Sequence, residues 1–110
     1  MPNIAAIDVG SNAIRMMVSR LGADAKLETL ENLRLPVRLG QDAFTTGLFS
    51  DQTMQMAVDA FLRFRKVAEV FEVTQTRAVA TSAMRETANS DLLMERISRD
   101  TGFNIEIING

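Results

Sequence analysis

The sequence predicts an α/β fold built on a mixed β-sheet, with elements in the order β-β-β-α-β-α-β. Three strand-like segments come first, a long helical stripe spans the middle of the chain, and strand and helix patterns then alternate to the end. With 110 residues and 46% hydrophobic content, the chain can bury one modest core. It therefore predicts a single domain, or part of one, over residues 1–110.

The first two strands are expected at residues 3–8 and 13–20, on either side of a polar turn. The first is an apolar run. The second alternates between apolar and other residues, which predicts that one of its faces is more deeply buried. The expected inward residues of the second strand are Ile14, Met16 and Val18.

Residues 26–35 fit two patterns. Their first leucines recur every three residues, as on a helix, whereas Leu33 and Leu35 alternate, as in a strand. A helix here would be short and poorly capped before Pro36, so a strand is favoured, and the resemblance described below supports it. Residues 36–50 carry turn-forming residues and are expected to form a loop.

A helix of about six turns is predicted after Ser50, a good N-cap residue, with Asp51 at its positive end. Its apolar residues repeat at steps of three and four, which predicts a face packed on the core rather than a cofactor site. These residues are Met54, Ala57, Phe61, Phe64, Ala68 and Phe71.

The last third of the chain reads as strand, polar turn, helix and strand. The strands are expected at 77–80 and 103–107, and the helix at 91–101 between a Ser90 cap and a Gly102 stop. The expected inward residues of this helix are Leu92, Leu93 and Ile97.

Composition excludes several kinds of chemistry. The chain has no Cys, His, Trp or Tyr, which rules out Cys/His zinc sites, thiol nucleophiles and Ser-His-Asp triads. Acid–base work would fall to Asp, Glu or the two lysines, Lys26 and Lys66. The net charge is −2 with scattered basic residues, so no nucleic-acid partner is expected. No membrane-spanning run or signal peptide is recognisable, which favours a cytoplasmic protein with no membrane partner.

The turn Asp8-Val9-Gly10-Ser11-Asn12 is the first candidate site. Gly10 tolerates a positive φ and close approach to the backbone, and successive N–H groups in such a turn can bind an anion. Asp8 would repel a bare phosphate, so its presence favours a metal ion or a bound water between them. The same residue types also form ordinary hairpin turns, and this alternative stays open.

A second turn, after the fourth strand, completes the candidate site. If that strand pairs in parallel with the first, their carboxyl ends lie side by side, where ligands of open α/β sheets bind. Thr81, Ser82 and Arg85 would then join the first turn, and an arginine fork suits phosphate oxygens. Arg85 could equally be solvated or pair with Glu86 or Asp91.

Four segments now justify a resemblance. They are IAAIDVGSNAIRMMV at 4–18, VRLGQDAFTTGLFS at 37–50, RAVATSAMRETANS at 77–90 and TGFNIEIING at 101–110. In order and spacing the chain resembles the N-terminal part of the exopolyphosphatase and guanosine pentaphosphate phosphatase (Ppx/GppA) family. That family belongs to the actin-like, ribonuclease H-like ATPase superfamily. The resemblance implies a ribonuclease H-like mixed sheet in an incomplete first lobe.

The resemblance also implies roles for individual residues. Asp8 would hold Mg²⁺ or another divalent cation, directly or through water. The implied phosphate-binding residues are Gly10, Ser11, Asn12, Arg15, Arg38, Thr81, Ser82 and Arg85. Arg15 is the weakest of them, because the family varies there, and Arg85 is the strongest. The implied reaction hydrolyses terminal phosphoanhydride bonds of inorganic polyphosphate or guanosine pentaphosphate.

In relatives, the catalytic glutamate follows soon after the position of Gly110, so the resemblance implies no catalytic residue within residues 1–110. These residues alone are expected to be inactive and to need the C-terminal part of the same protein as a partner. An uncovered apolar sheet surface would favour self-association, for example as a homodimer. Two alternatives remain. One is a non-catalytic anion-binding or interaction module, and a weaker one is a sugar or acetate kinase-like lobe, against which residues 81–85 argue.

Overall fold

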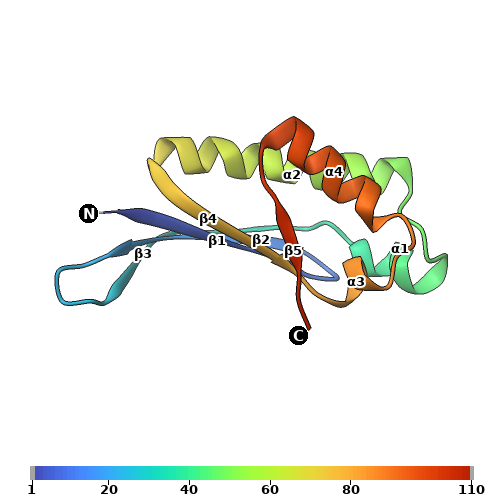
Figure 1. The fold of residues 1–110 in the computed structure, drawn as a ribbon, viewed down its shortest axis with the longest axis horizontal. Helices are drawn as coiled ribbons and strands as arrows, with labels where there is room; N and C mark the ends of the chain where they lie inside the picture. The colour runs from blue at the N-terminus through green and yellow to red at the C-terminus, as the bar shows by residue number, and fades with distance from the viewer. Residues whose placement is uncertain (1, 110) are drawn as a thin grey trace.

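The computed structural model describes residues 2–109, so Gly110 lies outside the described part of the chain. A five-stranded sheet has the order β3-β2-β1-β4-β5 (Figure 1). The strands are β1 (Asn3–Val9), β2 (Ile14–Leu21), β3 (Leu27–Leu35), β4 (Val73–Ala80) and β5 (Ile105–Ile107). The helices are α1 (Leu39–Thr45), α2 (Asp51–Val70), α3 (Ser82–Arg85) and α4 (Ser90–Thr101).

The sheet is mixed, as predicted. β1 pairs antiparallel with β2, and β2 antiparallel with β3, which confirms the strand interpretation of residues 26–35. On its other side β1 pairs in parallel with β4, and β4 in parallel with β5. The parallel pairing of β1 with β4 is the arrangement on which the candidate site depends.

Helices α2 and α4 lie on the same face of the sheet, and the core forms beneath them (Figure 1). Phe61 and Phe64 of α2 are fully buried, with ring centroids 5.8 Å apart in an edge-to-face arrangement. The sheet contributes the inward residues of its central strands. Those of β2 are Ile14, Met16 and Val18, as the alternation predicted.

The predicted long helix is confirmed as α2. The side-chain oxygen of Ser50 accepts a hydrogen bond from the Thr53 N–H at 3.1 Å, so Ser50 is the N-cap. The predicted apolar stripe faces the core, and its last members, Ala68 and Phe71, are partly buried. Among residues 2–109, no helix is long and apolar enough to cross a bilayer.

Four elements differ from the sequence-based expectation. Strand β5 begins at Ile105 rather than at residue 103, since its pairing with β4 begins there. Helix α1 occupies part of the expected loop 36–50, and the single turn of α3 occupies the expected turn 81–85. Strand β4 begins at Val73 rather than at residue 77. After the partly buried Val73, residues 74–77 are exposed and polar, so they carry no alternating pattern, but this part of β4 pairs with the start of β1.

Two predictions for α4 were wrong. Ser90 is the first helical residue and Asn89 takes the N-cap position. The Asn89 side chain makes no cap bond, because it is hydrogen-bonded to Phe49 instead. Leu92 points outward and is 54% exposed, since the core-facing side of the helix carries Leu93 and Ile97. Gly102 ends the helix at φ 82°, as predicted.

The opposite face of the sheet carries no helix within residues 2–109 (Figure 1). Met17 is 42% exposed there and Leu27 is 60% exposed, beside shallow hollows that Ile4, Ala6 and Arg77 help to line. Parallel strands are usually covered on both faces. This open face therefore exposes the apolar Met17 and Leu27, in line with the expected uncovered apolar surface, beside charged residues such as Arg77.

Candidate functional site at the carboxyl ends of the central strands

The two turns of the candidate site begin side by side. We call the turn at residues 10–13 the first corner and the segment 81–85 the second corner. Val9 and Ala80, the last residues of β1 and β4, are register partners in the parallel pair. Neighbouring strands lie about 4.8 Å apart, so Gly10 and Thr81 leave the sheet as neighbours. At the same end of the molecule, Figure 1 shows the β1–β2 turn beside α3 and α1.

The first corner is a tight turn. The N–H of Gly10 donates to the carbonyl oxygen of Ala13 at 3.0 Å. The positive-φ glycines in the described chain are Gly47 and Gly102, so Gly10 does not use the left-handed freedom that the sequence suggested. Its lack of a side chain matters for space, because a Cβ there would lie 3.2 Å from the Ala13 oxygen. Within residues 2–109, the side chains of Ser11 and Asn12 make no hydrogen bonds to other protein groups.

Asp8 lies one residue before the end of β1 and is exposed. Its position alternates with the buried Ile7 and Val9, so it stands on the open face. Arg15 is its register partner on β2, yet the two form no ion pair among the described residues. The carboxylate is thus accessible to a cation.

The described residues contain no group of three acidic side chains that could hold a metal by themselves. Mg²⁺ commonly binds through one or two carboxylates, with substrate phosphates and waters completing its shell. Asp8, exposed and unpaired among residues 2–109, fits that mode of binding. It does not fit a metal cage made of protein groups alone.

The two other candidate arginines, Arg15 and Arg38, lie in different surroundings. Arg15 is exposed on the open face, opposite both Asp8 and Arg34. Arg38 is exposed and occupies the N-cap position of α1, two residues before the Gly40 that contacts Ser11. The backbone therefore brings Arg38 to the candidate site and leaves Arg15 on the sheet surface next to it.

The second corner is the single turn of α3. The Thr81 carbonyl accepts from the Arg85 N–H at 3.1 Å, and the side chains of Thr81 and Ser82 are partly exposed. The guanidinium of Arg85 donates to the Ile108 carbonyl at 3.1 Å and lies 3.6 Å from the Glu86 carboxylate. The pairing with Glu86 that the sequence left open is thus present. The arginine also ties α3 to the end of β5.

Sequence reasoning missed the residues that hold these corners together. The N–H of Gly40 donates to the Ser11 carbonyl at 2.7 Å. The side-chain oxygen of Asn89 accepts a hydrogen bond from the Phe49 N–H at 2.9 Å, and its side-chain nitrogen donates one to the Phe49 carbonyl at 3.0 Å. The sequence signals were faint: a glycine beside the buried Leu39, and an asparagine that resembled an ordinary turn residue.

Asp42 stabilises the chain that follows α1. Its carboxylate accepts a hydrogen bond from the Ser50 N–H at 2.9 Å. This bond to the charged form lowers the pKa of Asp42 below its ordinary value of 3.8, because protonation would weaken it.

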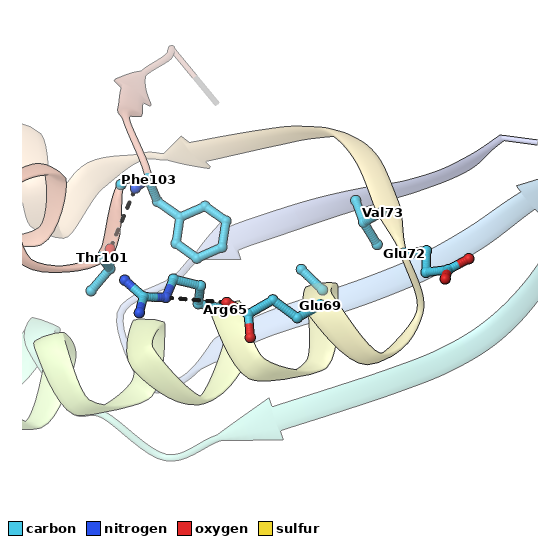
Figure 2. Close-up of a pocket in the computed structure, with 8 residues that line it drawn as sticks. Arg65, Glu69, Glu72, Val73, Thr101 and Phe103 are labelled. Atoms are coloured by element: carbon cyan, nitrogen blue, oxygen red, sulfur yellow. Dashed lines mark hydrogen bonds and ion pairs between the residues drawn. The ribbon is translucent and has the colours of Figure 1, made fainter.

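A separate hollow lies away from these corners, between the end of α2, the start of β4 and the α4–β5 connection (Figure 2). Its apolar part includes Val73 and Phe103. Arg65 at its rim is paired with Glu69 at 3.6 Å, and Figure 2 shows the Glu72 carboxylate pointing away from Phe103. Because it adjoins the amino end of β4, this hollow is not part of the candidate site.

Comparison with known proteins identifies close likenesses. The model of the Ppx/GppA phosphatase family matches residues 17–110. A guanosine-5'-triphosphate,3'-diphosphate pyrophosphatase of Aliivibrio fischeri is 30% identical, over 99% of this chain and 22% of its own length. Exopolyphosphatase 1 of Mycobacterium leprae is 24% identical, over 97% of this chain and 32% of its own.

A solved structure shows the same likeness. The Aquifex aeolicus member of the Ppx/GppA family is 27% identical and superposes with a TM-score of 0.93, over 98% of this chain and 35% of that one. The expected actin-like mixed α/β fold is thereby confirmed. The chain spans about a fifth to a third of the length of these relatives.

Proposed function

The chain belongs to the Ppx/GppA phosphatase family, and we propose that the complete gene product hydrolyses terminal phosphoanhydride bonds. The proposed substrates are inorganic polyphosphate and guanosine pentaphosphate, because one relative is named an exopolyphosphatase and another a guanosine-5'-triphosphate,3'-diphosphate pyrophosphatase. Residues 1–110 would supply part of the site, namely its phosphate- and metal-contacting corners. The rest of the same protein would be their partner.

One observation carries the proposal: the pairing of Val9 with Ala80 starts the two corners from adjacent positions. The first corner offers backbone N–H groups together with the side chains of Ser11 and Asn12. The second offers the hydroxyls of Thr81 and Ser82. Donors that converge from two neighbouring loops suit a phosphate with several oxygens. Ligands of open α/β sheets occupy this same edge.

Arg85 is proposed to neutralise phosphate charge. A guanidinium has five N–H donors, and the contacts with Ile108 and Glu86 leave some of them for an anion. Arg38 would add a second positive charge from the start of α1. In phosphoryl transfer, positioned positive charge and donors supply most of the catalysis, since they stabilise charge on the phosphoryl oxygens.

Asp8 is proposed as the protein ligand of a divalent cation, with Mg²⁺ as the natural choice for a carboxylate beside phosphates. When bound, that cation would neutralise the negative charge of the transferring phosphoryl group. The role of Asp8 is to hold the cation at the carboxyl end of β1. Without the cation, the Asp8 carboxylate would oppose phosphate binding by charge repulsion.

A second candidate function is a non-catalytic anion-binding module. It would need only the two anion-binding corners described above, whereas hydrolysis also needs a group that activates water. The two candidates differ in one measurable respect. Both predict that polyphosphate binds, but only the first predicts that phosphate is released.

The test is a phosphate-release assay on the complete gene product, with tripolyphosphate, long-chain polyphosphate and guanosine pentaphosphate as separate substrates and Mg²⁺ present. Release from at least one of them supports the phosphohydrolase. Binding without release would replace it with the binding module. Neither binding nor release would overturn both.

A further inference from the structure

Helix α1 connects the two corners of the candidate site through close backbone contacts. At its first turn, Gly40 donates to the Ser11 carbonyl at 2.7 Å. Beyond its last turn, Phe49 is held at both its N–H and its carbonyl by the side chain of Asn89, and the Ala88 N–H donates to the Gly47 carbonyl at 3.0 Å. Residues 39–49 thus fasten the turn at 10–13 to the segment that follows α3.

The contact at Ser11 exists because residue 40 has no side chain. A Cβ added to Gly40 would lie 2.7 Å from the Ser11 Cβ and 3.2 Å from the Ser11 carbonyl oxygen. Real Cβ atoms do not approach as closely as 2.7 Å, so one of the two segments would have to move. Gly40 is buried, and its neighbour Leu39 is fully buried in the core, so α1 resists displacement.

The turn is the part that can give way. It spans only residues 10–13 between two strands, and the bond from Gly10 to Ala13 closes it. Moving Ser11 would reorient the N–H groups and the hydroxyl that the turn offers. Interactions that depend on several converging donors lose strength when one segment moves by a fraction of an ångström.

We propose that Gly40 is a positioning residue: its backbone contact with Ser11 sets the conformation in which the turn at 10–13 binds phosphate. The proposal rests on the proposed function for its ligand. The conformational part does not, because the contact joins two segments of the chain itself. Asn89 has the matching role at the other end of residues 39–49, where its hydrogen bonds to Phe49 hold this segment against the residues that follow the second corner.

The experiment uses the 110-residue chain, tripolyphosphate with Mg²⁺ as the probe, and amide NMR spectra as the readout. Gly40→Ala should shift the amide signals of residues 10–13 before any ligand is added, and should raise the dissociation constant of tripolyphosphate by about tenfold or more. Gln41→Ala, an exposed change on the same helix, should do neither.

A second variant pair identifies the cause. Ser11→Gly removes the Cβ that an alanine at position 40 would meet at 2.7 Å and leaves only the 3.2 Å approach to the carbonyl oxygen of residue 11. Adding Gly40→Ala to Ser11→Gly should therefore raise the dissociation constant by a clearly smaller factor than Gly40→Ala does in the unmodified chain. If Gly40→Ala alone does not fold, the double variant should fold, since the 2.7 Å approach is gone. If both fail to fold, or if Gly40→Ala leaves the signals of residues 10–13 in place, the proposal is overturned.

A different outcome would bear on the proposed function. If the unmodified 110-residue chain binds no tripolyphosphate, the titration is repeated on the complete gene product, which holds the rest of the proposed site. No binding there either would overturn the phosphate site, and the ligand-free amide shifts of residues 10–13 alone then decide whether Gly40 sets the turn. If the chain binds tripolyphosphate and Gly40→Ala binds it equally well, the site stands and the positioning role falls.

Discussion

Nη1 of Arg85 donates a hydrogen bond to the carbonyl oxygen of Ile108 at 3.1 Å, which joins α3 to the end of β5. Nε of the same guanidinium lies 3.6 Å from the Glu86 carboxylate, and the side chain remains 40% exposed. Arg85 therefore joins α3 to the end of β5 and still faces solvent. Charge and geometry both make it the residue whose loss should be most informative.

Arg85→Ala should lower the rate of phosphate release by the complete gene product by about tenfold or more, since one charge-assisted contact is worth about 1.5 to 3 kcal/mol. Arg85→Lys should recover only part of that rate, because lysine keeps the charge but not the planar fork. Arg99→Ala, which removes an exposed arginine paired with Asp100, is the matched control. Equal rates for Arg85→Ala and Arg99→Ala would contradict the assignment.

Asp8→Asn should raise the Mg²⁺ concentration needed for half-maximal phosphate release, because it removes the charged ligand proposed at the end of β1. Asp59→Asn is the control. Asp59 is an exposed carboxylate on α2 that accepts a hydrogen bond from Gln55. A Mg²⁺ titration of phosphate release distinguishes the two variants. An unchanged midpoint for Asp8→Asn would remove Asp8 from the metal site.

Asp42 should make stability depend on pH at the acid end. Its folded-state pKa is lowered, chiefly by the hydrogen bond from the Ser50 N–H, so its contribution is present above the ordinary value of 3.8 and is lost as the pH falls through the lower folded value. Urea unfolding of the wild type and of Asp42→Asn should therefore differ near pH 6, the difference should begin to shrink near pH 3.8, and the two should converge only below the lower folded-state pKa. A gap that stays constant down to pH 3 would show that the charge is not the cause.

Adjacent methionines on β2 should differ sharply in their effect on stability. Met16 is fully buried beneath the helices, so Met16→Ala should cost about 2 to 5 kcal/mol of unfolding free energy. Met17 is 42% exposed on the open face, so Met17→Ala should cost about 1 kcal/mol or less. Denaturant unfolding of the 110-residue chain compares them. A large cost at Met17 would mean that another molecule or a second copy covers that face.

The sheet and the long helix could be predicted because their patterns are periodic. Met16 and Val18 alternate with exposed residues, and the α2 stripe repeats at helical spacing between a Ser50 cap and a core-facing Phe64. The parallel pairing of β1 with β4 followed from the order of elements. That pairing places Gly10 next to Thr81, so both corners of the site were accessible to sequence reasoning.

The connecting parts could not be predicted in this way, because tertiary contacts create them. Helix α1 contains a glycine and is too short to show periodicity, and its start is fixed by the hydrogen bond from Gly40 to Ser11. Asn89 rather than Ser90 takes the N-cap position of α4, and its side chain is hydrogen-bonded to Phe49, 40 residues away in the sequence, instead of capping the helix. Such partners have no local signature.

The central claim is that two corners share one anion, and an amide NMR titration of the 110-residue chain with tripolyphosphate and Mg²⁺ tests it most directly. The signals that should move together, with a single dissociation constant, are those of Gly10, Ser11, Asn12, Thr81 and Ser82. Movement at one corner only, or at residues around the hollow of Figure 2, would contradict the claim.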